Sequence, residues 1–133
     1  MLPSVDALLA AARAAAGRAY APYSHFRVGA ALLDADGGMH LGCNVESASY
    51  GLTNCAERTA IFSAVAVGAR RPFVAMAIVC PDAPPAGGAD GCSPCGACRQ
   101  VMVEHFASEA PVVLDGNGSF TVHELLPHSF RLG

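Results

Sequence analysis

The chain has 133 residues, enough for one domain with its own hydrophobic core, and we expect a single domain over residues 1–133. Its net charge of -3, with only 8 Lys and Arg residues, excludes the basic surface that nucleic-acid binding requires and favours a small-molecule substrate. Hydrophobic residues make up 53% of the sequence and charged residues 14%, which favours a closely packed oligomer over a monomer with exposed apolar surface.

The first predicted element is an amphipathic helix. Ser4 is a suitable N-cap, apolar residues recur on one face after it, and Gly17 lies near its end. Residues 1–20 lack the basic segment followed by an apolar run that marks a signal peptide. No stretch of the chain reaches the roughly 18 apolar residues of a membrane span. We therefore expect a cytoplasmic protein.

A hairpin and a second helix follow. Residues 28–34 and 39–45 are rich in small and branched apolar side chains and flank the turn signal Asp36-Gly37-Gly38, which predicts two antiparallel strands. Residues 55–67 have apolar side chains at helical spacing, and Gly68 ends that helix.

The C-terminal half alternates strands and helices. Residues 73–80 form a continuous apolar run, as expected of a central strand covered on both faces, and residues 81–91 form a loop. The later elements are a helix over 95–106, short strands over 112–114 and 119–122, and a brief helix near Glu124. This order predicts an α/β fold in which helical layers enclose a sheet.

Six cysteines lie at positions 43, 55, 80, 92, 95 and 98. A reducing compartment makes metal binding or catalysis a better explanation for them than disulfides. We expect Cys43 and Cys80 to be small buried residues with free thiols.

Two motifs carry the most specific signal, Cys55-Ala56-Glu57 and Pro94-Cys95-Gly96-Ala97-Cys98. Each begins a predicted helix, where unpaired N–H groups and the positive end of the helix dipole lower the pKa of a thiol. Three thiolates from two helix starts would make a zinc site with an open fourth position, which is typical of catalytic zinc. A water in that position has its pKa lowered to about 7, and Glu57 is close enough in sequence to carry protons there.

The position of Cys92 leaves other arrangements open, because Cys92 and Cys95 are also spaced C-x-x-C. A redox dithiol and a structural four-cysteine zinc knot both fit that spacing. Each has no use for Glu57, so the motif at Cys55 favours the three-ligand site.

Short segments spread over nearly the whole chain carry a family resemblance. They are Pro22-Tyr23-Ser24, Phe26 with Val28-Gly29-Ala30-Ala31, Gly42-Cys43-Asn44-Val45-Glu46, Cys55-Ala56-Glu57-Arg58-Thr59-Ala60, Cys95-Gly96-Ala97-Cys98-Arg99-Gln100 and Glu124-Leu125-Leu126-Pro127. Together they resemble the homotetrameric, zinc-dependent cytidine deaminases. The resemblance implies a three-layer α/β/α sandwich with a mixed central sheet of about five strands.

The resemblance also implies roles for individual residues. Zn²⁺, one ion per subunit, would be held by Cys55, Cys95 and Cys98, and Glu57 would shuttle protons to N3 of the pyrimidine and to the leaving ammonia. The residues implied to contact the substrate are Phe26 on the pyrimidine face, Asn44 and Glu46 on the ribose hydroxyls, and the backbone N–H of Ala56 on the 2-oxygen. Arg58 and Gln100 would lie beside the thiolates, and Tyr50 and Phe130 would approach the active site of a neighbouring subunit.

The implied activity is hydrolytic deamination of free cytidine and deoxycytidine to uridine and deoxyuridine in pyrimidine salvage. One alternative is deamination of another aminopyrimidine, such as blasticidin S, and another is a non-catalytic zinc module used for assembly. The chain departs from the family pattern at Arg27, where Pro is usual, at Ser47, where Asn is usual, and at the additional Cys92.

Overall fold

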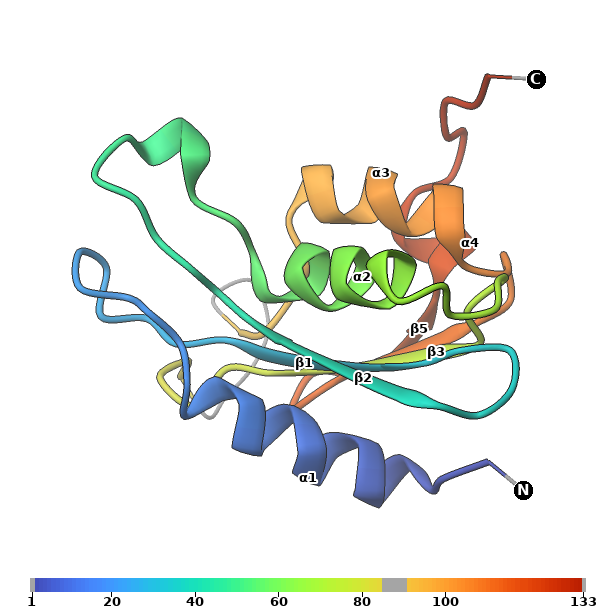
Figure 1. Ribbon diagram of the computed structural model, residues 1–133, viewed down its shortest axis with the longest axis horizontal. Helices are drawn as coiled ribbons and strands as arrows, with labels where there is room; N and C mark the ends of the chain where they lie inside the picture. The colour runs from blue at the N-terminus through green and yellow to red at the C-terminus, as the bar shows by residue number, and fades with distance from the viewer. Residues whose placement is uncertain (1, 85–90, 133) are drawn as a thin grey trace.

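A mixed five-stranded sheet separates two helical layers in the computed structural model, which describes residues 2–84 and 91–132 (Figure 1). The strands are β1 (Gly29–Leu33), β2 (Met39–Cys43), β3 (Ala75–Val79), β4 (Pro111–Leu114) and β5 (Gly118–Thr121). Their spatial order is β2-β1-β3-β4-β5, with β3 and β4 parallel and every other neighbouring pair antiparallel. The predicted sandwich with about five strands is confirmed.

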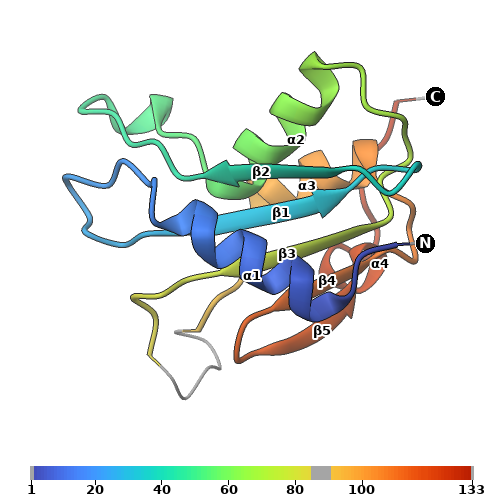
Figure 2. The ribbon, with the colours of Figure 1, turned by 60° about the horizontal axis from the view of Figure 1, so that its bottom comes forward.

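The helices divide unequally between the faces of the sheet. They are α1 (Val5–Ala16), the 3-10 helix η1 (Tyr50–Leu52), α2 (Ala56–Ala66), α3 (Gly96–His105) and α4 (Val122–Leu125). Helix α1 alone covers one face, while α2, α3 and α4 lie on the other (Figures 1 and 2). Within residues 2–84 and 91–132, no helix has both the length and the apolar character needed to cross a bilayer.

Strand β1 shows why the sequence lacks polar alternation here, since each of its residues is buried. Ala31 and Leu33 point to the core under α1, together with Leu8, whereas Ala30 and Leu32 point to the core under α2 and α3. Successive strand residues face opposite sides of a sheet, so a strand with helices on both sides is apolar throughout. The predicted central position of the strand at 73–80 is confirmed by β3.

Two glycines let the helices approach the hairpin closely. A Cβ on Gly29 would lie 1.9 Å from the carbonyl oxygen of Ala12 in α1, and one on Gly42 would lie 2.3 Å from the backbone nitrogen of Ala60 in α2. Backbone atoms cannot yield to such a contact, so both positions need glycine. The contact at Gly42 holds α2, which carries Cys55 and Glu57 at its start, directly against β2.

Most predicted boundaries are confirmed, including the Ser4 cap, whose hydroxyl accepts from the N–H of Ala7 at 3.1 Å. Two details differ. Val122 belongs to α4 and not to the last strand, because the Thr121 side chain caps that helix through a capping box with Glu124. Helix η1 had no counterpart among the predicted elements. The predicted loop over 81–91 lies partly outside the described residues, at 85–90.

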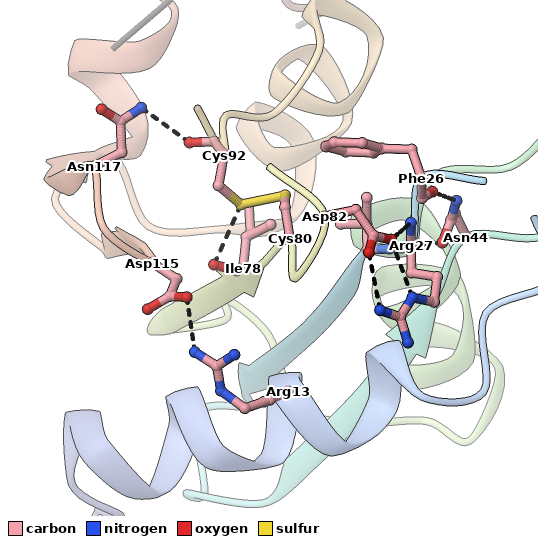
Figure 3. Close-up of a disulfide and its surroundings, with 11 residues drawn as sticks. Arg13, Phe26, Arg27, Asn44, Ile78, Cys80, Asp82, Cys92, Asp115 and Asn117 are labelled. Atoms are coloured by element: carbon pink, nitrogen blue, oxygen red, sulfur yellow. Dashed lines mark hydrogen bonds and ion pairs between the residues drawn. A yellow bond between two sulfur atoms is a disulfide. The ribbon is translucent and has the colours of Figure 1, made fainter. Parts of the chain in front are cut away.

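The prediction that the cysteines outside the metal motifs are free buried thiols is wrong for Cys80. Cys80 and Cys92 form a disulfide with their Cα atoms 5.5 Å apart (Figure 3). Cys43 has a free thiol but is only partly buried. Cys80 directly follows β3 and Cys92 lies in the segment before α3, and the fold brings these two segments together. Cys92 is consequently not a metal ligand in this structure, and the C-x-x-C arrangement with Cys95 is excluded.

Candidate active site

Three cysteine sulfurs meet where the first turns of α2 and α3 come together. Cys55 is the N-cap of α2 and Cys95 is the N-cap of α3, so both motifs begin helices as predicted. The Sγ atoms of Cys55, Cys95 and Cys98 all lie within 4.8 Å of one another, and those of Cys55 and Cys95 are 3.8 Å apart. The backbone N–H of Cys98 also points at the Cys95 sulfur, at 3.5 Å. The structure therefore brings together the three residues that the sequence predicts as ligands.

Charge at this cluster is balanced by an arginine. Nη2 of Arg58 donates to the Cys55 sulfur at 3.2 Å, so Arg58 lies beside the cysteine cluster, as the family resemblance implies. A hydrogen bond from the Cys98 thiol, together with Arg58, lowers the pKa of Cys55 to about 5. The same bond raises the pKa of Cys98, because that thiol is the donor. When a metal cation binds close thiols that share protons in this way, it displaces those protons and leaves thiolate ligands.

Glu57 lies in the first turn of α2, two residues after Cys55, and is only 4% exposed. Burial raises the pKa of its carboxyl to about 7, and the negative charge of Cys55 acts in the same direction. Removal from water disfavours the charged carboxylate, so this side chain changes protonation state near neutral pH. A carboxyl with that property beside clustered thiols is suited to proton transfer.

The donor set fits zinc. Three soft sulfur ligands at two helix starts match the preference of zinc for thiolates, and Arg58 offsets part of their negative charge. Cys95 is exposed at the surface of the described chain whereas Cys98 is buried, so the cluster can be reached from one side. Three protein ligands with one accessible side correspond to a catalytic rather than a closed structural site.

Phe26 and Asn44 form a second part of the site, on the loops before β1 and after β2. Phe26 is 36% exposed and so belongs to the surface and not to the core. Asn44 is 8% exposed, and its amide nitrogen donates to the carbonyl of Phe26 at 2.8 Å while its Oδ1 accepts from the N–H of Val28 at 2.8 Å (Figure 3). Asn44 thus shapes the backbone that carries Phe26, and its implied contact with ribose stays a prediction.

A cavity of about 320 Å³ opens beside Glu46 and is lined by Tyr23, Ser24, Glu46, Tyr50 and Thr53. The carboxylate of Glu46 accepts the backbone N–H groups of Tyr23 and Ser24 at 3.0 and 3.1 Å and also the Ser24 hydroxyl. The Ser24 hydroxyl and these N–H groups lower the pKa of Glu46, which keeps it ionised at neutral pH. An anionic acceptor at the edge of a cavity can bind hydroxyl groups.

Gln100 in α3 contacts Phe130 in the C-terminal segment. The amide nitrogen of Gln100 donates to the carbonyl of Phe130 at 2.8 Å, so it holds the C-terminal segment. The implied place of Gln100 beside the thiolates stays a prediction. Phe130 and Tyr50 are 67% and 77% exposed, respectively.

One residue of this region had no signal in the sequence. Asp82 follows β3 and accepts three hydrogen bonds from Arg27, next to Phe26. The two residues are 55 positions apart, so no local pattern links them.

Comparison with known proteins identifies the family of the chain. Residues 3–114 match the family described as cytidine and deoxycytidylate deaminase zinc-binding region. The cytidine deaminase of Sporosarcina psychrophila is 47% identical over 130 residues, covering 95% of this chain and 90% of that protein. That of Halalkalibacterium halodurans is 52% identical over 117 residues, covering 84% and 83%. The solved cytidine deaminase from Burkholderia pseudomallei is 49% identical, with a TM-score of 0.85 over 96% of this chain and 100% of that one.

Proposed function

The chain belongs to the cytidine and deoxycytidylate deaminase family, and from this premise we propose that it deaminates free cytidine and deoxycytidine. Water adds at C4 of the pyrimidine, the bond from C4 to the amino nitrogen breaks, and ammonia leaves with uridine or deoxyuridine as the product. The observation that carries the proposal is the cluster of three cysteine sulfurs with the buried carboxyl of Glu57 beside it.

Zinc held by Cys55, Cys95 and Cys98 would supply a water that is nucleophilic at neutral pH, since such binding lowers the pKa of water to about 7. Glu57 holds a proton at its carboxyl and passes protons to N3 and to the departing amino group. The backbone N–H of Ala56, the first residue of α2, is one of the groups left unpaired by a helix start. We assign it to the pyrimidine 2-oxygen.

The partly exposed ring of Phe26 is assigned to the pyrimidine face, where an aromatic surface stacks on a base. Glu46 and Asn44 are assigned to the ribose hydroxyls. In support, Glu46 is ionised and lines the 320 Å³ cavity. These contacts favour a nucleoside over a bare base.

We further assign the enzyme to a homotetramer in which each active site is completed by a neighbouring subunit. Tyr50 lines the 320 Å³ cavity, Phe130 is held by Gln100 of α3, and both are large aromatic residues that are more than half exposed. Burial between subunits would remove that apolar surface from water. Closed dihedral symmetry is the usual way in which four identical chains bury the same patches.

The cytoplasm is the proposed compartment, because thiols that hold a metal must stay reduced. The Cys80–Cys92 disulfide makes this testable. Rapid alkylation of intact cells followed by mass spectrometry should find Cys80 and Cys92 at least partly reduced. A fully oxidised pair together with export of the protein would contradict a cytoplasmic location.

The function is tested by following absorbance and ammonia release with cytidine, deoxycytidine, cytosine and blasticidin S in parallel, on protein whose zinc content has been measured. Turnover of the two nucleosides, with little of cytosine and blasticidin S, is the expected result. Selective turnover of blasticidin S would indicate the alternative deaminase. Bound zinc without any turnover would indicate an assembly module.

A further inference from the structure

Asp82 accepts hydrogen bonds from the segment that carries Phe26, although the two are 55 positions apart in the sequence. Its Oδ2 accepts from the backbone N–H of Arg27 at 2.8 Å and from Nε of Arg27 at 3.0 Å, and its Oδ1 accepts from Nη2 at 2.9 Å (Figure 3). Two parallel bonds between guanidinium and carboxylate fix the mutual orientation of the groups. The bond to the peptide N–H then ties that orientation to the backbone next to Phe26.

These hydrogen bonds matter because residues 26–28 lie outside any helix or strand and have no regular ladder of backbone hydrogen bonds. Side chains take over this task. Asn44 binds the carbonyl of Phe26 and the N–H of Val28 from one side, and Asp82 binds the N–H of Arg27 from the other. Three successive residues are thus held between an amide on the β2 side and a carboxylate on the β3 side.

Phe26 is partly exposed at the surface of the molecule, at 36%. A ring that stacks on a flat ligand must stand at the right height and tilt. The hydrogen bonds from Asn44 and Asp82 fix the backbone that carries this ring.

For the position of Phe26, the hydrogen bond from the backbone N–H of Arg27 to Asp82 matters more than the ion pair between the two side chains. The Arg27 and Asp82 side chains are 49% and 29% exposed, and exposed ion pairs contribute little to stability. Asp82 stays ionised at every physiological pH, because the Arg27 side chain and backbone N–H lower its pKa to about 2. Its importance thus lies in a fixed geometry rather than in stabilising the fold.

The segment that contains Asp82 is also linked to the segment that leads to the cysteine cluster. Cys80, two residues before it, is disulfide-bonded to Cys92, three residues before Cys95 (Figure 3). The Cys92 sulfur also contacts the carbonyl of Ile78 in β3, at 3.5 Å. The segment that holds the Phe26 loop is therefore joined to the segment that leads into α3.

We propose that Asp82 is a positioning residue that sets the place of the Phe26 ring over the pyrimidine by holding the Arg27 peptide. This rests on the proposed function, since it assigns Asp82 to nucleoside binding and not to the chemical step. Loss of Asp82 should weaken binding of the pyrimidine and leave the cysteine cluster and Glu57 as they are.

The test compares Asp82→Ala with three variants. Asp82→Ala should raise KM for cytidine about fivefold, while kcat and zinc content stay close to those of the parent. Asp82→Asn keeps an acceptor for the Arg27 N–H, and Arg27→Ala keeps that N–H, so each should change KM by less than about twofold. Asp115→Ala removes the exposed ion pair with Arg13 at 2.8 Å, away from Phe26, and should leave KM unchanged. Asp82→Leu is similar in shape to Asp but has no acceptor, and it replaces Asp82→Ala if that variant does not fold.

The decisive measurement is a double-mutant cycle with Phe26→Ala. If Asp82 acts through the ring, Asp82→Ala should have no further effect on KM once the ring is gone. An equal effect in both backgrounds, or an unchanged KM in Asp82→Ala with an active parent and a raised KM in Phe26→Ala, would overturn this inference alone. A parent protein without any deaminase activity would overturn the proposed function as well.

Discussion

The cysteine cluster, which forms the metal end of the candidate site, is built at two helix starts. The part around Phe26, which we assign to the pyrimidine and call the pyrimidine end, is built from loops that distant side chains hold in place. Cys55 and Cys95 each cap a helix, so a few neighbouring residues determine where their sulfurs point. Phe26, by contrast, depends on Asn44 and Asp82, which come from other parts of the chain. A site made of local motifs should tolerate changes elsewhere in the molecule, and one made of loops should not.

The largest expected effect comes from the cysteines themselves. Replacing Cys55, Cys95 or Cys98 by Ala should remove zinc and with it all measurable turnover, because each supplies one of three ligands. Zinc per chain, determined by metal analysis, is the measurement, and Cys43→Ala is the matched control with zinc retained. A Cys98→Ala protein that keeps its zinc would show that the ligand set is wrong.

Glu57→Gln should give the next largest loss, about 10² to 10⁴ in kcat, with zinc content unchanged. The amide has the shape of the carboxyl but cannot exchange protons at neutral pH. Ammonia release under saturating cytidine measures the effect, and the same replacement at the exposed Glu104 in α3 is the control. Activity within about tenfold of the parent would contradict the proton-transfer role of Glu57.

Arg58→Gln tests whether the metal end needs charge compensation in addition to ligands. Removing the Nη2 contact to the Cys55 sulfur leaves the thiolate charges less balanced, so we expect kcat to fall about tenfold with zinc still bound. Competition with a zinc chelator should also remove the metal at a lower chelator concentration. Parent-like kinetics and chelator resistance would show that Arg58 only fills space.

Truncation before Ser129 tests whether Phe130 contributes to the active site of a neighbouring subunit. Loss of Phe130 should raise KM for cytidine about threefold to tenfold and leave zinc unchanged, because the exposed ring is assigned to a neighbouring pocket. Light scattering and activity measured on the same dilution series show whether dissociation removes activity. A fully active monomer would refute shared active sites.

The smallest expected effect on turnover comes from removing the disulfide. Replacing Cys80 and Cys92 together by Ser should lower the free energy of unfolding by about 2–3 kcal/mol, since the bond closes a loop with a sequence separation of 12. Zinc content and kcat should stay within about twofold of the parent, because neither sulfur is a metal ligand. Loss of zinc in this variant would show that the metal end depends on distant parts of the chain after all.

The sequence patterns that predicted correctly are those in which near neighbours decide the outcome. Helix starts at Cys55 and Cys95, the Ser4 cap and the apolar run of β3 depend on residues within a few positions of one another. The ribose contacts implied for Asn44 and Glu46 stay predictions. In the structure these two residues hold the loops that carry Phe26 and Ser24, through hydrogen bonds that span 18 and 22 positions.

The sequence by itself determined the layered α/β fold and the set of three thiolates with Glu57, because hydrophobic periodicity and helix starts are local properties. Only the tertiary structure decided that Cys80 pairs with Cys92 and that Asp82 holds Arg27. Both contacts join the segment after β3 to another part of the chain, and the packing of the whole sheet between its helical layers brings those parts together.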